Sequence, residues 1–244
     1  MTTEYQGPQL AAEDVTREFT VGGRMIQAVR SVSMAVEQGD FVALLGRSGS
    51  GKTTLLNLLG GLDTPSSGLV LFQGRDMTKI GAAEMASLRR TTFGFVFQSF
   101  GLLPLLSAHE NVELPLRIGG IARQEREARA KEALGVVGLG HRLKHRPYEL
   151  SGGEQQRVAI ARAMVHRPSV ILADEPTAEL DSANAKTVFD LLGEIVRRDR
   201  VTVIVATHDR AVMEVAQRVL ELRDGALDKQ PEAQEKWAKP KGKP

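Results

Sequence analysis

The chain has 244 residues, of which 42% are hydrophobic and 25% charged, with a formal net charge of +2 and no cysteine. This composition excludes global disorder, disulfides and thiolate metal sites, and so small a net charge is a poor match for a nucleic-acid-binding surface. The length suits one domain with an inserted lobe, and no stretch reaches the ~18 apolar residues of a membrane span.

The expected elements of the first hundred residues are short strands and helices. Apolar runs bounded by turn residues predict strands, and an apolar run of helical length directly after glycines predicts a helix. Strands are expected at residues 32–36, 41–45, 68–72 and 93–97, and helices at residues 52–59 and 82–90.

The middle of the chain is expected to be mostly helical. Ser107 and Glu110 fit a capping box, so a helix should begin there, and Pro115 should end it because proline lacks the backbone donor. A second helix is expected at residues 123–137. Its expected i,i+4 ion pairs are Glu125 with Arg129 and Glu127 with Lys131.

Strands and helices alternate again after residue 165, a pattern typical of a mainly parallel sheet covered on both faces. Strands are expected at residues 170–173, 201–206 and 219–222, and helices at residues 182–199 and 210–215. The chain should therefore be an α/β protein with one domain over residues 1–227. Its core is expected at about residues 10–98 and 166–227, its helical lobe at about residues 99–165, and a disordered, proline-containing tail at residues 228–244.

A glycine-rich loop at residues 46–53 lies between an expected strand and an expected helix. Its sequence, GRSGSGKT, fits the phosphate-binding pattern, in which backbone N–H groups surround an anion at the start of a helix. Lys52 would reach the β- and γ-phosphates of a nucleotide, and the Thr53 hydroxyl would bind Mg²⁺. The alternative, a simple Gly/Ser turn, accounts poorly for eight matching positions in this context.

Two acidic residues, Asp174 and Glu175, end the apolar run at residues 170–173. Ligands of open α/β sheets bind at the carboxyl ends of the strands, where these acids would lie. Asp174 would hold Mg²⁺ through water, and Glu175 would polarise the attacking water. An acidic turn is the alternative when this segment is read alone, but the phosphate-binding loop elsewhere in the chain disfavours it.

The sequence LSGGEQQR at residues 150–157 resembles the signature motif of the ATP-binding cassette family. Ser151 and Glu154 fit a capping box, so a helix should begin there with free backbone N–H groups. Gly152 and Gly153 would leave that helix end open to a phosphate. The alternative is an ordinary capped helix, which explains Ser151 and Glu154 but not two adjacent glycines that weaken the first turn.

The resemblance extends from about residue 10 to residue 225, and it implies roles for residues outside these motifs. Gln98 would sense Mg²⁺ and the γ-phosphate, and His208 would contact the γ-phosphate. Asp181 belongs to a loop that would face a partner subunit, where Glu179 departs from the small or amide residue of many members. Phe19 would stack on adenine, although a phenylalanine near a strand is more often part of the core.

Three sets of site residues follow from the motifs and the resemblance. The catalytic set is Glu175, His208 and Gln98. The Mg²⁺ set is Thr53, Gln98 and Asp174. The ATP-binding set is Phe19, Gly46, Arg47, Ser48, Gly49, Ser50, Gly51, Lys52, Thr53, Thr54, Ser151, Gly152, Gly153, Glu154 and Asp181.

The resemblance implies a P-loop NTPase core with an inserted helical signature lobe and a small N-terminal antiparallel β region. It also implies a homodimer or paired cassette that shares two ATP sites, bound to transmembrane permease subunits at the cytoplasmic face of the cell membrane. No nucleic acid is expected as a partner, and contact with the membrane is expected only through the permease.

Four segments, at residues 60–63, 95–98, 110–116 and 172–177, look like the branch of lipoprotein-release, macrolide-efflux and antimicrobial-peptide-resistance ATPases. This likeness implies export or extraction of a hydrophobic, peptide or lipoprotein-like substrate. Two alternatives stay open: a force-transmitting ATPase of the cell-division type that transports nothing, and a soluble ATP-binding cassette protein outside transport.

Overall fold

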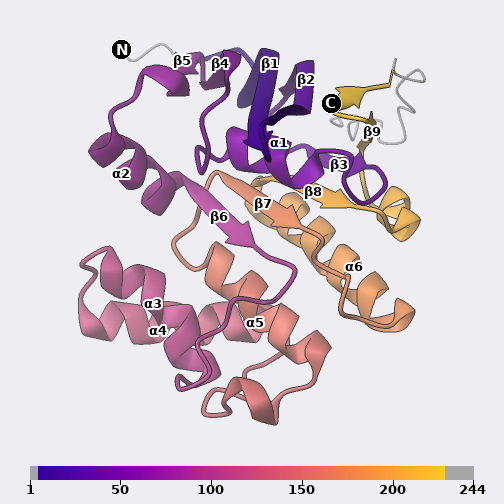
Figure 1. Cartoon of the computed structure of the whole chain (residues 1–244). Coiled ribbons are helices and arrows are strands. Elements are labelled where there is room, and N and C mark those ends of the chain that lie inside the picture. The colour runs from indigo at the N-terminus through magenta and orange to yellow at the C-terminus, as the bar shows by residue number, and fades with distance from the viewer. Residues whose placement is uncertain (1–4, 229–244) are drawn as a thin grey trace, which may run out of the picture.

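The computed structural model describes residues 5–228, in which a larger and a smaller sheet are combined with helices (Figure 1). The larger sheet has the strand order β10-β9-β3-β8-β7-β6, and all of its strands except β10 run parallel. Its strands are β3 Phe41–Leu45, β6 Phe93–Val96, β7 Val170–Asp174, β8 Thr202–Thr207, β9 Arg218–Arg223 and β10 Ala226–Leu227. The predicted α/β fold with a mainly parallel sheet is therefore confirmed.

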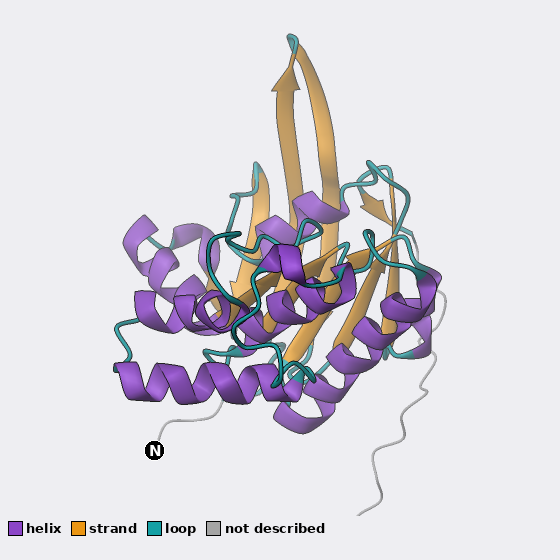
Figure 2. Ribbon diagram, turned by 90° about the horizontal axis from the view of Figure 1, so that it is seen from below, coloured by secondary structure: helices purple, strands orange, loops and turns teal. Residues whose placement is uncertain are grey.

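The smaller sheet is antiparallel and has the order β2-β1-β4-β5. Its strands are β1 Leu10–Val21, β2 Arg24–Val36, β4 Ser67–Phe72 and β5 Arg75–Asp76. Gly22 and Gly23 form the β1–β2 turn at positive φ, which glycine adopts without steric cost. In Figure 2 this pair of long strands extends beyond the rest of the chain. Of these two long strands, the sequence pattern predicted only residues 32–36, the end of β2. It missed β1, because charged residues interrupt the apolar alternation of that strand.

Two hydrophobic clusters lie on the two faces of the larger sheet, because successive side chains of a strand point to opposite faces. In β3, Phe41 and Ala43 belong to one cluster, while Val42 and Leu44 belong to the other. The first cluster also contains buried residues of the helical lobe and of α6, and the second contains those of α1 and the smaller sheet. The parallel strands are therefore buried on both faces, and their carboxyl ends form the edge where a site can open.

Six α-helices lie among the described residues and flank the larger sheet. They are α1 Lys52–Leu59, α2 Ala82–Thr92, α3 Ala108–Ile118, α4 Arg123–Val136, α5 Gly152–Met164 and α6 Ser182–Asp199. Short 3₁₀ helices occur at Met77–Lys79, Pro147–Glu149 and Arg210–Glu214. The expected helix at residues 210–215 is thus a 3₁₀ helix, and no helix of the described residues is long and apolar enough to cross a membrane.

The predicted capping box at Ser107 is confirmed, but the prediction that Pro115 ends the helix is wrong. Pro115 lies inside α3, which continues for another turn to Ile118. Proline removes only one backbone hydrogen bond there, and its own carbonyl still accepts from the N–H of Gly119 at 2.9 Å. Val112 and the fully buried Leu116, on either side of Pro115, anchor the helix in the core and offset that loss.

One of the two predicted ion pairs on α4 is also wrong. Glu125 does pair with Arg129, but Glu127 pairs with Arg123 at 2.7 Å instead of Lys131. Arg123 and Lys131 both lie four residues from Glu127, so the helical spacing alone could not predict which of them pairs with it.

The predicted disordered tail at residues 228–244 lies outside the described residues, apart from its first residue.

His166 follows α5, is half-buried and contacts the backbone of β6. Its Nε2 lies 3.1 Å from the carbonyl oxygen of Phe93, so this nitrogen carries the proton, and the buried Nδ1 has no hydrogen-bond partner. Burial lowers the pKa of His166, and the hydrogen bond to Phe93 offsets this only in part. The folded state therefore resists protonation more than the unfolded state does.

We expect this histidine to make the protein less stable in acid. Its contribution is fully present above the unfolded pKa of about 6.5, and it is lost as the pH falls toward the depressed folded pKa. The unfolding free energy of the wild type should fall more steeply between pH 7.5 and pH 5 than that of His166→Gln. The excess loss should be about 1.4 kcal/mol for each unit of pKa depression. Urea unfolding at several pH values measures it.

His141→Gln is the matched control, because it makes the same substitution at an exposed histidine. Equal slopes for the wild type and His166→Gln would show that His166 is not a source of the acid sensitivity.

Candidate active site

The glycine-rich loop connects β3 to α1, where the sequence predicted it. Gly49 and Gly51 have φ values of 78° and 100°, which favour glycine. A Cβ at Gly51 would also collide with the carbonyl oxygen of Ala28 on β2. Because α1 begins at Lys52 without a side-chain cap, its first backbone N–H groups stay available to an anion.

Lys52 is almost fully buried, with an exposed fraction of 5%, and its side chain folds back over the loop. Its Nζ donates to the carbonyl oxygens of Gly46 at 2.9 Å and Arg47 at 3.1 Å. It also lies 3.2 Å from Oε1 of Glu175, at the end of β7. The ammonium group therefore sits at the centre of the loop, where it can bind phosphate oxygens.

Glu175 connects the ends of three parallel strands. Its backbone N–H donates to the carbonyl oxygen of Ala206 on β8, at 2.8 Å. Its Oε2 lies 2.9 Å from Nδ1 of His208 and accepts from the N–H of His208 at 3.3 Å. Glu175 has a φ of 46°, a left-handed conformation that costs a side-chain-bearing residue about 1–2 kcal/mol. This turn directs the carboxylate toward both Lys52 and His208.

Asp174 and Thr53, which the sequence predicted to bind Mg²⁺ together with Gln98, lie within hydrogen-bonding distance of each other. The Thr53 hydroxyl donates to Oδ1 of Asp174 at 3.1 Å. Burial raises the pKa of Asp174, as does the nearby charge of Glu175, while Thr53 and Lys52 oppose the rise. No group of three or more His, Asp or Glu side chains among the described residues could hold a metal ion. A threonine hydroxyl and a carboxylate still fit Mg²⁺, which keeps several waters and also binds nucleotide phosphates.

Gln98 follows β6 and lies near the same site. Its Nε2 is 3.5 Å from Oε1 of Glu179, the residue that departs from the family pattern. The chain then turns into the helical lobe, and the half-buried Arg162 of α5 donates to the carbonyl oxygens of Phe100 and Gly101. Sequence analysis missed Arg162, because nothing in the local pattern pairs it with a loop sixty residues away.

A cavity of about 330 Å³ brings part of the phosphate-binding loop together with the three predicted catalytic residues. It is lined by Ala28, Ser48, Gly49, Gly51, Lys52, Thr53, Thr54, Gln98, Glu175, Ala178 and His208. Sequence analysis missed Ala28 because it is an ordinary residue in a strand. It contributes because a β-bulge of β2 brings its backbone against the loop.

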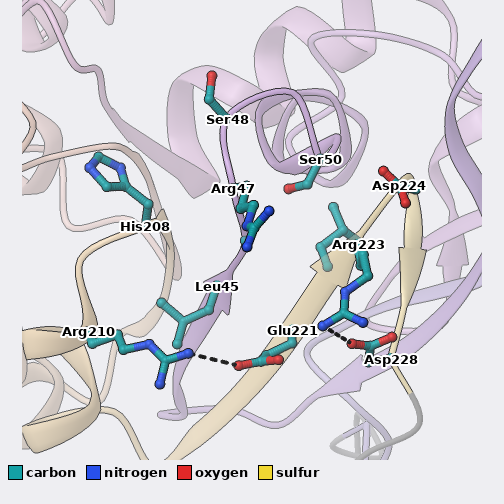
Figure 3. A pocket seen from close by; sticks show the side chains of 12 residues that line it. Leu45, Arg47, Ser48, Ser50, His208, Arg210, Glu221, Arg223, Asp224 and Asp228 are labelled. Carbon is teal, nitrogen blue, oxygen red and sulfur yellow. Dashed lines mark ion pairs between the residues drawn. The ribbon is translucent and has the colours of Figure 1, made fainter.

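A second cavity, of about 720 Å³, lies along the phosphate-binding loop beside β9 (Figure 3). Arg47 extends into it, and its wall contains the ion pairs Arg210–Glu221 at 3.9 Å and Arg223–Asp228 at 3.5 Å. It is larger but contains neither Lys52 nor the acids of β7. The chemistry that the sequence predicts therefore belongs to the smaller cavity.

The predicted signature residues line neither cavity. They lie at the start of α5, where Ser151 accepts from the N–H of Glu154 at 3.3 Å and Glu154 accepts from the N–H of Ser151 at 2.9 Å. The predicted capping box is thus confirmed. A Cβ at Gly153 would come within 2.7 Å of Oδ1 of Asn184, so glycine is needed there for packing against α6. Sequence analysis offered only an open phosphate site as the reason for this glycine.

Asp181 and Phe19 also lie outside the linings of both cavities. Asp181 caps α6 by accepting from the N–H of Asn184 at 2.9 Å, which lowers the pKa of Asp181. Phe19 is on β1 and is 37% exposed, so it is not the core residue that the alternative interpretation would require. Arg17 lies over its ring, 4.6 Å from the ring centroid.

Comparisons with known proteins give a consistent family. The family model described as "ABC transporter" matches residues 29–178. The chain is 47% identical over 222 residues to the "Macrolide export ATP-binding/permease protein MacB" of Wolinella succinogenes, covering 91% of this chain and 34% of that protein. The protein of the same name from Marinobacter nauticus is 47% identical over 220 residues, covering 90% and 34%. The chain thus spans about a third of the length of these curated relatives.

Solved structures give the same result. The ATP-binding cassette MJ0796, in a dimeric post-hydrolysis state bound to ADP and Pi, aligns with a TM-score of 0.83 at 41% identity, covering 90% of this chain and 97% of that one. The cbiO1 protein of Clostridium perfringens, part of the ABC transporter complex cbiONQ, aligns with a TM-score of 0.84 at 29% identity, covering 94% and 90%.

We expect Lys52→Ala to abolish nucleotide binding at ordinary ATP concentrations, because a buried ammonium at the centre of the loop is lost. Equilibrium titration with a fluorescent ATP analogue measures this. Lys79→Ala is the control, since Lys79 is 79% exposed and lines neither cavity. Unchanged affinity in Lys52→Ala would contradict the assignment of this loop to phosphate.

Proposed function

This chain belongs to the ABC transporter family of ATPases, and we propose that it hydrolyses Mg-ATP in sites shared by two subunits to drive a membrane permease. The observation that carries the proposal is the arrangement at the smaller cavity. Lys52, Thr53 and Glu175 line it and Asp174 is hydrogen-bonded to Thr53, while the signature helix begins elsewhere on the chain. One subunit therefore presents two halves of a site that do not face each other.

The phosphates of ATP would bind at the loop, where Lys52 and the first N–H groups of α1 meet them. Thr53, Asp174 and Gln98 would hold Mg²⁺, which supplies positive charge against the phosphate oxygens. Asp174 must be ionised to hold Mg²⁺.

Glu175 would accept a proton from the attacking water, and His208 would hold its carboxylate in place. In the structure both Lys52 and His208 contact this carboxylate. A nucleotide phosphate competes for Lys52 because it carries more negative charge than one carboxylate. Binding of the γ-phosphate would therefore draw Lys52 away from Glu175 and leave an oxygen of Glu175 free for water.

The other half of each site would be the signature of a second subunit. The Ser151 side chain accepts from the N–H of Glu154, so the N–H groups of Gly152 and Gly153 are left for a phosphate of the partner's nucleotide. The dimeric form of the relative MJ0796 supports a paired arrangement. Asp181, which begins α6, would lie near the same interface.

Exposed apolar side chains in and near the segment after Gln98 support docking of a permease. They are Phe97, Leu103, Leu105, Ile118 and Tyr148, with exposed fractions of 41–81%. A cytoplasmic helix of the permease would bind against side chains of this set, and the ATPase would sit at the cytoplasmic face of the membrane. The MacB relatives, named for macrolide export, support a hydrophobic exported substrate.

We expect Glu175→Gln to keep ATP binding and to lower steady-state turnover by at least ~100-fold, because the amide cannot accept the proton. Phosphate release measures turnover, and titration with a fluorescent ATP analogue measures binding. Glu221→Gln is the matched control. Glu221 lines the larger cavity, so this variant should hydrolyse ATP at the normal rate. Near-normal turnover in Glu175→Gln would remove Glu175 from the role of general base.

A further inference from the structure

Arg17 and Phe19 stand two residues apart on β1 and pack against each other. Cζ of Arg17 lies 4.6 Å from the centroid of the Phe19 ring, within the range of a cation–π contact. Nε of Arg17 donates to Oδ2 of Asp63 at 2.8 Å. The side chains of Arg17 and Asp63 are only 26% and 28% exposed, so their ion pair is partly shielded from water. The guanidinium group of Arg17 therefore contacts both the Phe19 ring and the Asp63 carboxylate.

Asp63 is itself fixed by the end of α1. Its N–H donates to the carbonyl oxygen of Asn57 at 3.3 Å, and its Oδ1 accepts from the N–H of Thr64 at 2.7 Å. Asn57 belongs to α1, the helix that begins at Lys52. A continuous series of contacts thus runs from the phosphate-binding helix, through Asp63 and Arg17, to the Phe19 ring.

The other strand of the Phe19 hairpin, β2, contacts the phosphate-binding loop. It pairs with Ile26 on β2, two residues before Ala28. The pairing skips Ala28, because Arg17 pairs with Val29 and Glu18 with Gln27. The backbone of Ala28 touches Gly51 in the loop. The strand that pairs with Phe19 therefore contacts the loop two residues beyond that pairing. One face of the ring is covered by Arg17, and 37% of the residue stays exposed.

We propose that Arg17 is a positioning residue for the nucleotide base: together with Asp63 it holds the Phe19 ring in one orientation, so that adenine stacks on the opposite face. This inference rests on the proposed function and on the expectation from the sequence that adenine stacks on Phe19. A free phenylalanine on a projecting hairpin would have to be ordered by each nucleotide that binds. Because Arg17 orders the ring beforehand, ATP should bind about three- to tenfold more tightly than it would to a free ring.

A purely structural ion pair between the hairpin and α1 would behave differently. Removing such a pair would change the stability of the chain, or would weaken the binding of ATP and of tripolyphosphate equally, because the effect would not depend on the nucleotide base. Inorganic tripolyphosphate separates the two roles, because it has the phosphates of ATP and lacks the base. The measured quantity is the ratio of the Kd of tripolyphosphate to the Kd of ATP, both with Mg²⁺, by isothermal titration calorimetry on the full chain.

Arg17→Met keeps the apolar length of the side chain and removes the guanidinium. We expect it to raise the Kd of ATP by about three- to tenfold and to leave the Kd of tripolyphosphate unchanged. Arg17→Lys, which keeps the charge without the planar group, should fall between Arg17→Met and the wild type. Arg24→Met, an exposed arginine at the start of β2, is the matched control and should alter neither constant.

A double-mutant cycle with Phe19→Ala completes the test. Once the ring is gone, adding Arg17→Met should weaken ATP binding no further. Equal weakening of ATP and tripolyphosphate by Arg17→Met, or an unchanged ratio, would overturn the proposal. Tighter ATP binding in Arg17→Met would also overturn it, because Arg17 would then occupy the face that the base needs.

The cycle also distinguishes failure of this inference from failure of the proposed function. An unchanged ratio in Phe19→Ala, with ATP still bound by the wild type, would show that the base does not stack on Phe19. That result would overturn the role of Arg17 and leave the ATPase proposal standing. Absence of ATP binding by the wild type would instead overturn the proposed function itself.

Discussion

The buried contact between Lys52 and Glu175 is the interaction on which the site depends. A buried ion pair is favourable only when further hydrogen bonds offset the loss of water, and both partners have them. Two loop carbonyls accept from Lys52, and His208 contacts Glu175. The same network accounts for the left-handed backbone of Glu175, which would otherwise be unfavourable. It holds the ammonium of Lys52 and the carboxylate of Glu175 close together, and in the proposed mechanism a phosphate competes for Lys52.

The fold supplies this network by placing strand ends side by side. β3 leads into the loop, its neighbour β8 leads to His208, and β7 on the far side of β8 leads to Glu175. The helical lobe carries the start of α5 away from these strand ends, and Arg162 connects α5 to the segment that follows Gln98. A displacement of the lobe would therefore move that segment and the signature helix together. Through this connection, a movement of the lobe on nucleotide binding would reach the surface proposed to bind the permease.

Local motifs were predicted well from the sequence, and contacts between distant segments were not. The loop at Lys52, the acids of β7 and the capping boxes depend on neighbouring residues, so their patterns are visible in the chain. The helix through Pro115 depends on burial of residues around it, which no local rule for proline contains. Gly153 packs against Asn184, and Arg17 packs between Phe19 and Asp63; both contacts need the folded structure to become visible.

The central claim, a site shared by two subunits, is tested most directly by covalently linked pairs. Gly152→Asp would place a carboxylate at the signature, where a Cβ meets nothing closer than Leu180 at 3.4 Å. A Lys52→Ala subunit linked to a Gly152→Asp subunit keeps one intact site in a head-to-tail dimer. A doubly substituted subunit linked to the wild type keeps none. If one intact site suffices for turnover, we predict ATPase activity in the first pair and not in the second. Equal activity in both would mean that each subunit hydrolyses ATP alone.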